Sequence, residues 1–214
     1  MAYKRKEDGV IFEYLRKQNL KTTILDVGAR KGSWYRNFKL VYPNLPVHMF
    51  EPTPNIVEYL NKHYGNMNHI SVHGEALSDC VGEFEFHLNL DKPAWSGLTK
   101  HPKHAYTTIR VPVKTIDSYN FPELSFIKID VEGNEYKTLN GAIKTIQRHK
   151  PIIYFECADV HLTNYTNTSA DVYNFFIDQG YTVYDLDMKK LTVDDFCTHT
   201  YNKPSFYHNF IAHV

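Results

Sequence analysis

Short apolar segments alternate with helical patterns over most of this 214-residue chain. Such segments, each bounded by polar or turn residues, are typical of strands that are buried on both faces of a parallel sheet. They occupy residues 23–27, 47–51, 69–73, 125–131 and 152–157. The spacing of amphipathic helices recurs between and after them, over residues 33–40, 55–63, 135–149 and 170–179. Because right-handed crossovers place such helices above and below a parallel sheet, the pattern predicts an α/β fold with helices on both faces.

Two further pairs of segments have a different pattern. Apolar and polar residues alternate over residues 82–88 and 109–116, as in half-exposed strands, so we expect an added edge hairpin there. Residues 181–186 and 206–214 are expected to form a C-terminal antiparallel strand pair, with a long loop between them. This pair would complete a mostly parallel, seven-stranded sheet.

The first predicted strand leads into a glycine-containing turn, with the sequence DVGARKGS at residues 26–33. Gly28 permits a tight turn and a close approach of the backbone to a ligand, and the N–H groups at a helix start attract a carboxylate or a phosphate. Glu51 ends the second strand, where folds of this kind bind ribose hydroxyls. A plain strand-to-helix connection would explain the glycines alone, but not the acid in register with them.

This turn departs from the pattern of dinucleotide-binding turns. In that pattern, Gly-x-Gly-x-x-Gly, the second and third glycines are replaced here by Arg30 and Ser33. Side chains at these positions would keep a pyrophosphate from approaching the protein backbone. The departure therefore favours a sulfonium nucleoside, S-adenosylmethionine, over NAD. The residues that we assign to cofactor binding in this part of the chain are Asp26, Gly28, Ala29, Arg30, Gly32, Glu51 and Pro52.

A group of motifs follows in the second half of the chain, with KIDVEGNE at residues 128–135, LNGA at 139–142 and PIIYFE at 151–156. Together with the DVGA turn, FEP at 50–52 and EALSD at 75–79, these motifs resemble the FkbM family of methyltransferases. The resemblance implies a class I methyltransferase (Rossmann-like) fold and S-adenosylmethionine as the methyl donor. It also implies an acceptor hydroxyl, usually on a sugar or a polyketide-type natural product.

The resemblance further implies an adenine site at residues 75–79. Ala76, Leu77 and Ser78 would line the base, and Glu75 or Asp79 would bond its exocyclic amine. One departure from the family is the pair Arg30-Lys31, which replaces an Asn and a neutral residue that the family often has. It places two positive charges beside the cofactor turn.

Methyl transfer to a hydroxyl requires the acceptor oxygen to be held in line with the leaving sulfur, and a base to take the hydroxyl proton. The base should lie at the carboxyl ends of the strands, where such folds bind their ligands. Asp130 ends the fourth strand and faces the crevice over the cofactor, so it is assigned to cofactor binding and is also the leading catalytic residue. Glu156, which ends the fifth, and His161, on the loop that follows, are the alternatives.

Four residues are candidates for binding the acceptor. Glu132 and Glu135 lie at the turn into a helix, where acids also stabilise the helix N-terminus. Trp95 and Ser96 belong to a long segment, residues 89–108, that is interpreted either as an acceptor lid or as an exposed insertion. Trp95 would stack on a sugar face and Ser96 would hydrogen-bond to it.

A metal site is a further possibility at the same strand ends. Asp130, Glu132 and Glu156 provide oxygen ligands of the kind that magnesium prefers. The chain has no His-x-His motif and no other cluster of acids, so we expect no bound metal. Its three cysteines stand far apart, with no spacing that indicates a disulfide framework or a zinc site.

Composition narrows the functional classes. Lys plus Arg equals Asp plus Glu, at 24 each, whereas proteins that grip a phosphate backbone usually have a basic excess. A polar N-terminus and the absence of an apolar run near about 18 residues predict a cytoplasmic protein with no membrane span. No linker or repeat divides the chain, so we expect a single domain, residues 1–214, with residues 1–22 as a helical lead-in.

Three functions remain open from the sequence. The first is an O-methyltransferase acting on a sugar hydroxyl in a small molecule or glycan, for example on a deoxyhexose such as rhamnose or fucose. The second is an RNA ribose 2'-O-methyltransferase, which the neutral net charge disfavours. The third is a non-catalytic module that binds the cofactor or a partner. The oligomeric state does not follow from the sequence.

Overall fold

The computed structural model describes residues 6–100, 103–162, 166–202 and 208–214. Its strands are β1 (Ile24–Val27), β2 (Val47–Phe50), β3 (Ile70–His73), β4 (Ala76–Leu77), β5 (Gly82–Asn89), β6 (Tyr106–Lys114), β7 (Phe126–Ile129), β8 (Ile152–Glu156), β9 (Thr182–Tyr184) and β10 (Asn209–His213). Its α-helices are α1 (Lys6–Arg16), α2 (Ser33–Phe38), α3 (Pro54–Tyr64), α4 (Glu135–Asn140), α5 (Ile143–His149), α6 (Asp159–Leu162), α7 (Ser169–Asp178) and α8 (Val193–Asn202). Two short 3-10 helices are η1 (Pro93–Trp95) and η2 (Ile116–Tyr119).

The large sheet has seven strands in the order β3-β2-β1-β7-β8-β10-β9. The pairs from β3 to β8 are parallel, whereas β10 runs antiparallel to both β8 and β9. This confirms the predicted mostly parallel, seven-stranded sheet with its C-terminal antiparallel pair. The strand order changes direction between β1 and β7, so the crevice at their carboxyl ends is the expected ligand position in such a sheet.

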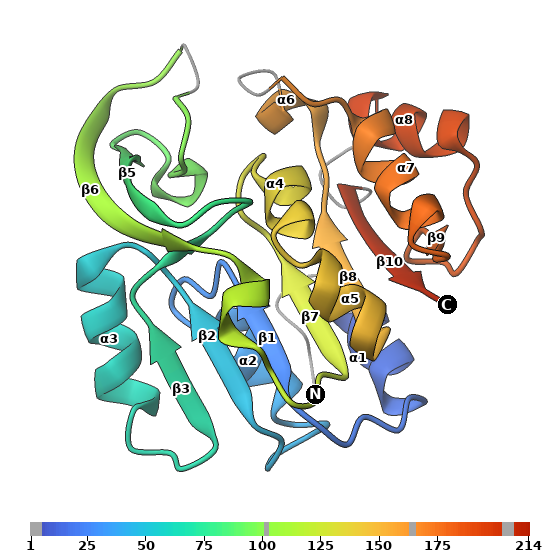
Figure 1. The fold of residues 1–214 in the computed structure, drawn as a ribbon, viewed down its shortest axis with the longest axis horizontal. Helices are drawn as coiled ribbons and strands as arrows, with labels where there is room; N and C mark the ends of the chain where they lie inside the picture. The colour runs from blue at the N-terminus through green and yellow to red at the C-terminus, as the bar shows by residue number, and fades with distance from the viewer. Residues whose placement is uncertain (1–5, 101–102, 163–165, 203–207) are drawn as a thin grey trace.

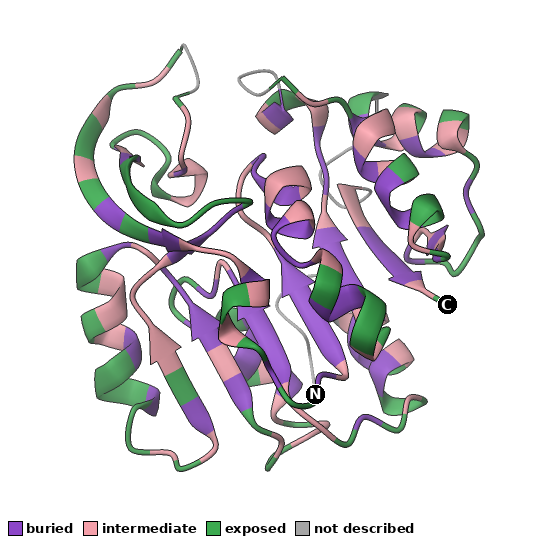
Figure 2. Ribbon diagram, in the orientation of Figure 1, coloured by how far each residue is buried: buried purple, intermediate pink, exposed green. Residues whose placement is uncertain are grey.

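The core has two parts, one on each face of this sheet. Because successive side chains of a strand point to opposite faces, Leu25 packs with helices α4, α5, α7 and α8, while Ile24 packs with α1, α2 and α3. The same alternation separates Ile127 from Phe126 and Phe155 from Tyr154. The central strands are therefore buried on both sides (Figure 2), as their continuous apolar sequence predicts.

The predicted hairpin is formed by β5 and β6, but it does not extend the edge of the large sheet. It belongs to a second, three-stranded sheet in the order β4-β6-β5. The reason is that Ala76 and Leu77, which follow β3 in the chain, pair with β6 as strand β4. This pairing places the hairpin away from the edge of the large sheet. A small core of its own, centred on Phe86, Val111 and Val113, stabilises this second sheet. Figure 1 shows the hairpin beyond the carboxyl ends of the central strands.

Two helical segments also differ from the sequence expectation. The single helix expected over residues 135–149 is divided into α4 and α5 at residues 141–142. Gly141 lies so close to the carbonyl oxygen of Ser78 that a Cβ atom there would be 2.0 Å from it, so this position requires glycine. The long loop expected between the last two strands contains helix α8, which packs against α7 through Phe196 and Tyr173. The expected N-terminal helix is present as α1; residues 1–5 and 206–207, at the ends of predicted segments, lie outside the described residues.

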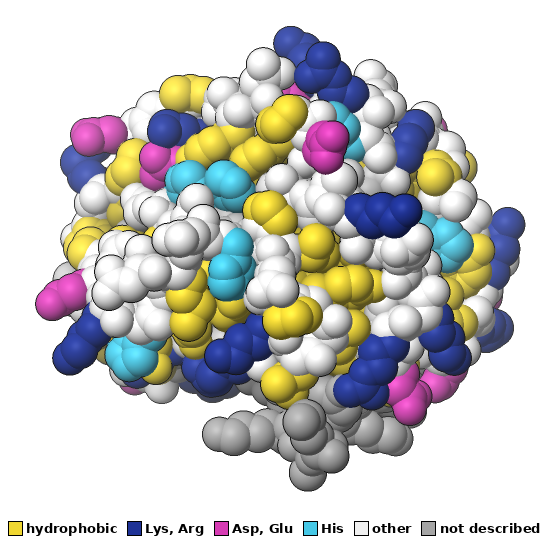
Figure 3. All heavy atoms as spheres, turned by 90° about the horizontal axis from the view of Figure 1, so that it is seen from below, with side chains coloured by type: hydrophobic (Ala, Val, Ile, Leu, Met, Phe, Trp, Pro, Cys, Tyr) yellow, Lys and Arg dark blue, Asp and Glu magenta, His cyan; other side chains and the backbone are white. Residues whose placement is uncertain are grey.

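Among the described helices, none is both long enough and apolar enough to span a bilayer. The face of the molecule seen from below the strands mixes Lys and Arg side chains with hydrophobic, acidic and uncharged ones (Figure 3). The cations on this face do not gather into a single stripe.

Candidate functional site

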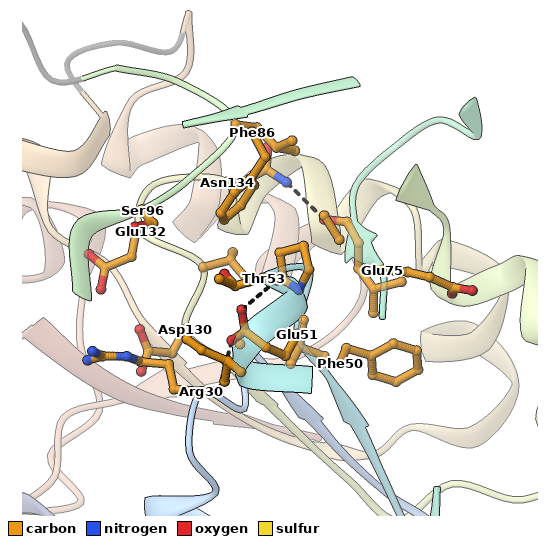
Figure 4. Close-up of a pocket in the computed structure, with 18 of the residues that line it drawn as sticks. Arg30, Phe50, Glu51, Thr53, Glu75, Phe86, Ser96, Asp130, Glu132 and Asn134 are labelled. Atoms are coloured by element: carbon orange, nitrogen blue, oxygen red, sulfur yellow. Dashed lines mark hydrogen bonds between the residues drawn. The ribbon is translucent and has the colours of Figure 1, made fainter. Parts of the chain in front are cut away.

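A pocket lies at the carboxyl ends of β1, β2 and β7, between the large sheet and the β5–β6 hairpin (Figure 4). Its lower wall consists of the turn after β1, the segment after β2 and the turn after β7. Its other walls come from β4, β5 and the segment around η1. The residues that line it are Val27, Gly28, Arg30, Phe50, Glu51, Pro52, Thr53, Ile56, Glu75, Ala76, Leu77, Phe86, Pro93, Ala94, Ser96, Leu98, Asp130, Val131, Glu132 and Asn134.

The turn after β1 can be made only with glycine at position 28. Gly28 has a φ of 77°, in the left-handed region, and a Cβ atom there would lie 1.8 Å from the carbonyl oxygen of Asp130. Its own N–H and that of Ala29 donate to the carbonyl of Phe50, at 3.0 Å each. The turn thus brings the ends of β1, β2 and β7 into contact and leaves a bare backbone surface on the pocket.

Glu51 is held by backbone donors on each side of its carboxyl group. Its Oε2 accepts the N–H of Arg30 at 3.0 Å, and its Oε1 accepts the N–H of Thr53 at 2.9 Å. The residue is only 5% exposed, and burial raises its pKa against the lowering effect of these hydrogen bonds. The carboxyl group is therefore fixed in direction, and each oxygen retains lone pairs that can accept from a ligand hydroxyl.

A buried lysine links the turn after β1 to the acid after β7. Lys128 donates through Nζ to the carbonyl oxygen of Gly28 at 2.8 Å and to that of Val27 at 3.2 Å. The same Nζ lies 3.4 Å from Asp26 Oδ1 and 3.4 Å from Asp130 Oδ2. Burial acts to lower the pKa of Lys128, but the two carboxylates outweigh it and raise that pKa. Lys128 is therefore a fixed positive charge beneath the pocket.

Asp130 and Glu156 form a carboxyl pair at the ends of β7 and β8. Burial acts to raise the pKa of Asp130, but the Lys128 ammonium and a hydrogen bond from Glu156 outweigh it, so the pKa is lowered. Burial, and then the negative charges of Asp130 and Glu132, raise the pKa of Glu156 well above its ordinary value. The two pKa values are thus moved in opposite directions, as expected for neighbouring carboxyl groups joined by a hydrogen bond.

His161 lies beside this pair, in contact with two other residues that the sequence singled out. Its Nδ1 is 3.3 Å from Glu132 Oε2, and its ring meets that of Trp95 edge-on at 5.0 Å between centroids. Glu132 has a φ of 57°, and burial with neighbouring negative charges raises its pKa to about 9. The strained turn after β7 therefore directs Glu132 toward His161 instead of toward bulk water.

The segment between β5 and β6 has a defined structure. Asn89 Oδ1 accepts the N–H groups of Asp91 and Lys92, at 3.0 and 2.8 Å, and Ser96 Oγ accepts the N–H of Asn89 at 3.0 Å. Asp91 Oδ2 accepts the N–H of Ala105 at 3.0 Å, which joins the two ends of the segment. These bonds distinguish it from a loose insertion and hold residues 93–98 against the pocket; residues 101–102 lie outside the described part.

The structure brings most of the predicted site residues to this pocket. Nine of them line it directly: Gly28, Arg30, Glu51, Pro52, Ala76, Leu77, Ser96, Asp130 and Glu132. Just outside the lining, Glu156 stands next to Asp130 and His161 next to Glu132, while Trp95 contacts His161. Asp26, Ala29, Gly32, Ser78 and Glu135 lie behind the walls.

Two of the residues behind the walls have a clear structural task. Glu135 is 2% exposed, and its Oε1 accepts the N–H of Val131 at 3.0 Å, so it shapes the turn before α4. Gly32 has a φ of 67° and packs directly against the ring of Tyr64.

Sequence reasoning missed several residues of the pocket. From the sequence, Lys128 could only be placed on the same strand face as Asp130. Nothing in the sequence showed that it would be buried between two carboxylates. Asn134 belongs to the KIDVEGNE motif, but its position on the wall opposite Glu51 depends on a contact with Leu77. Phe86 and Leu98 reach the pocket because the hairpin folds over it.

A cation could be held by one group of side chains among the described residues. Glu132, Glu156 and His161 each offer a ligand atom, and these atoms lie within 4.8 Å of one another. The set differs from the one considered from the sequence, because His161 takes the place of Asp130, which is paired with Lys128. Cationic side chains already act on this part of the site, since Lys128 lies 3.4 Å from Asp130 and the charge of Arg30 opposes the rise in the pKa of Glu132.

Comparison with known proteins places this geometry in a family. The Methyltransferase FkbM domain matches residues 26–183. The 2-O-methyltransferase NoeI of Sinorhizobium fredii (strain NBRC 101917 / NGR234) is 27% identical over an aligned length of 157 residues, and the match covers 65% of this chain and 64% of NoeI. The chain thus spans slightly less than two thirds of that relative.

Solved structures share the fold. Methyltransferase FkbM from Methylobacillus flagellatus KT matches with a TM-score of 0.61 at 20% identity, over 98% of this chain and 48% of that one. A putative rRNA methylase from Clostridium thermocellum matches with a TM-score of 0.55 at 11% identity, over 97% of this chain and 94% of that one. Since the family domain covers most of the sequence, including the turn after β1 and the acids after β7 and β8, the chain belongs to the FkbM methyltransferase family.

Proposed function

We propose that this protein is an O-methyltransferase that transfers the methyl group of S-adenosylmethionine to a sugar hydroxyl, for example on a deoxyhexose such as rhamnose or fucose in a glycan. The observation that carries the proposal is the meeting, in one pocket, of the Gly28 turn, the carboxyl group of Glu51 held by backbone donors, and the carboxyl group of Asp130. The relative NoeI is named as a 2-O-methyltransferase, which supports oxygen as the acceptor atom.

The pocket fits the methyl donor on three points of chemistry. Glu51 presents lone pairs suited to two ribose hydroxyls. The bare backbone of Gly28 admits the amino-acid end of the donor, and Arg30 provides a positive charge for its carboxylate. Pro52, Ala76 and Leu77 offer apolar surfaces for a flat base. When bound, S-adenosylmethionine supplies an electrophilic methyl group on a sulfonium.

Asp130 is the residue that we assign to take the proton of the acceptor hydroxyl. Among the three candidate bases it is the one that lines the pocket, and Lys128 keeps it ionised. With the donor bound, an acceptor hydroxyl would receive its methyl group and lose its proton to Asp130, and the donor would leave as S-adenosylhomocysteine. Glu156 then serves as the hydrogen-bond partner that holds Asp130 in place, and His161 remains the alternative base.

The acceptor would lie between Asp130 and the segment around η1. Ser96 and Glu132 line that part of the pocket and offer hydroxyl and carboxyl groups to a sugar. The Trp95 ring already has two neighbours, Lys92 Nζ at 3.8 Å from the ring centroid and the edge-on ring of His161. Trp95 would contact the sugar through the part of its ring that these two residues do not cover. Glu135 would act on the acceptor only through the turn that it supports.

We propose that the reaction needs no metal ion, because Lys128 already supplies positive charge beside Asp130 and Arg30 acts on the neighbouring Glu132. We also propose a small-molecule or glycan acceptor, not a nucleic acid, on the basis of the equal numbers of acidic and basic residues. All three cysteines are free, which agrees with a reducing compartment such as the cytoplasm.

A turnover assay with separate cofactor titrations tests this proposal. Purified protein is given S-adenosylmethionine and a panel of rhamnosides and fucosides, with and without a chelator, and S-adenosylhomocysteine release is measured. Asp130→Asn should lower the turnover rate by about 10²- to 10⁴-fold, the usual contribution of a general base, while it still binds S-adenosylhomocysteine. Asp178→Asn, at an exposed position at the end of α7 and outside the pocket, is the matched control.

The outcomes separate the parts of the proposal. If turnover with a sugar persists in the presence of the chelator and is lost in Asp130→Asn, the result supports the sugar acceptor, the metal-free reaction and Asp130 as the base. Cofactor binding without turnover on any sugar would contradict the sugar acceptor alone. If His161→Gln loses the turnover and Asp130→Asn keeps it, the assignment of the base is wrong.

A further inference from the structure

Asn134 lies on the pocket wall opposite Glu51 and is only 3% exposed (Figure 4). Its Nδ2 donates to the carbonyl oxygen of Leu77 at 2.9 Å. A carbonyl oxygen can only accept, so this bond fixes which end of the side-chain amide is the nitrogen. The Oδ1 atom is therefore an acceptor.

This Oδ1 is buried and has no hydrogen-bond partner within the described part of the chain. Asn134 stands at the residue before α4, where an asparagine oxygen usually accepts a backbone N–H of the first helical turn, yet no such bond is formed here. Buried polar atoms without partners are rare because they cost free energy, and one that lines a pocket is suited to a ligand donor.

The surrounding wall is otherwise poor in acceptors. Ala76, Leu77 and Phe86 have apolar side chains, and the Leu77 carbonyl already receives hydrogen bonds from Asn134 and from Thr138 Oγ1, each at 2.9 Å. Glu75 also lines the pocket, but Lys114 Nζ lies 2.7 Å from its Oε1 and Tyr119 donates to its Oε2. Among the described residues of this wall, Asn134 Oδ1 is thus the buried side-chain acceptor that has no hydrogen-bond partner at all.

We propose that Asn134 recognises the 6-amino group of the adenine of S-adenosylmethionine. The inference rests on the proposed cofactor: with the ribose at Glu51, the base lies along the apolar wall formed by Pro52, Ala76 and Leu77. Adenine has apolar faces, and its amino group is the only donor on the edge away from the ribose. The assignment differs from the one that the sequence resemblance implies, in which Glu75 or Asp79 bonds this amine; Asp79 is exposed and accepts from Ser78 instead.

A double-mutant cycle between protein and ligand tests the contact. The dissociation constants of S-adenosylhomocysteine and of its analogue with hydrogen in place of the 6-amino group are measured by calorimetry for wild type and Asn134→Leu. The wild type should bind the analogue about 5- to 10-fold more weakly, as expected for one neutral hydrogen bond. In Asn134→Leu the two ligands should bind within about twofold of each other, because the acceptor is gone.

Thr138→Val is the matched control, because it also removes one hydrogen bond to the Leu77 carbonyl but leaves Asn134 Oδ1 in place. This variant should keep the wild-type preference for the amino group. If wild type binds both ligands equally, or if Asn134→Leu weakens both by the same factor, Asn134 does not read the amine and the inference is wrong. A folded wild type that binds neither ligand would instead overturn the proposed cofactor itself, and the inference with it.

Discussion

The ammonium group of Lys128 donates a 2.8 Å hydrogen bond to the main-chain carbonyl of Gly28, and so fixes the turn that opens the pocket. The same group lies 3.4 Å from a carboxyl oxygen of each of two acids, Asp26 behind the turn and Asp130 in front of it. The buried cation therefore couples the shape of the turn to the ionisation of the residue assigned as the base.

Replacement of Lys128 by Met should lower the free energy of unfolding by about 3–5 kcal/mol at pH 7, because it leaves a buried carboxylate without its partner. The deficit should shrink as the pH falls toward 4. Loss of the lysine raises the pKa of Asp26 further, and protonation then removes the uncompensated charge. Urea unfolding at several pH values measures this. Lys144→Met, at an exposed position on α5, is the control, and an equal deficit in both variants would contradict the account.

Gly28→Ala should destabilise the protein much more than Gly180→Ala. Both glycines have a positive φ, 77° and 80°, but a methyl group at position 28 would meet the Asp130 carbonyl at 1.8 Å, while position 180 has open space around it. We expect a loss of about 1 kcal/mol at Gly180, for the backbone conformation alone, and at least about 3 kcal/mol at Gly28. Equal losses in chemical denaturation would show that the turn is not held tightly against β7.

A histidine pair on β2 and β3 should make stability depend on pH. The Nδ1 of His48 is 2.8 Å from Nε2 of His73, and burial, followed by the nearby His73, lowers the pKa of His48 to about 4. The folded state therefore favours the neutral ring. This stabilisation is complete above about pH 6.5, the unfolded value, and is lost as the pH falls toward 4.

Between pH 7 and pH 4.5, the free energy of unfolding of His48→Gln should accordingly fall by about 1 kcal/mol less than that of the wild type. This figure allows for the partial exposure of the ring. Thermal or urea unfolding at the two pH values gives the difference. His63→Gln, at an exposed site on α3, should follow the wild type. If all three proteins lose the same stability, the pair does not titrate as proposed.

Much of the fold follows from the apolar pattern because the central strands are buried on both faces. The segment from Ile24 to Val27 has no polar face to present, except at Asp26, so only a covered parallel strand suits it. The pattern could not show where the hairpin attaches, since that depends on pairing between Ala76 and Val113, which are far apart in the sequence. Helix α8 was missed because most of its residues are polar and only one stripe, including Phe196, is buried.

The sequence could predict a site residue where the geometry requires one residue type, as at Gly28, or where the residue lies at a strand end, as at Glu51 and Asp130. The sequence could not predict residues whose role depends on a partner from a distant segment. Asn134 acquires its free acceptor only because its nitrogen is held by Leu77, and Trp95 meets His161 only because the hairpin folds over the strand ends. Tertiary contacts of this kind leave no local signal.

The central claim is that the pocket binds S-adenosylmethionine through Glu51. Calorimetric titration with S-adenosylhomocysteine, and separately with NAD, tests it on wild type, Glu51→Gln and the exposed control Glu58→Gln. We expect wild type and Glu58→Gln to bind S-adenosylhomocysteine equally and NAD not at all. Glu51→Gln should bind at least tenfold more weakly, because hydrogen bonds to a charged acceptor are lost. Absence of binding by folded wild type, or equal affinity of Glu51→Gln and Glu58→Gln, would contradict the account.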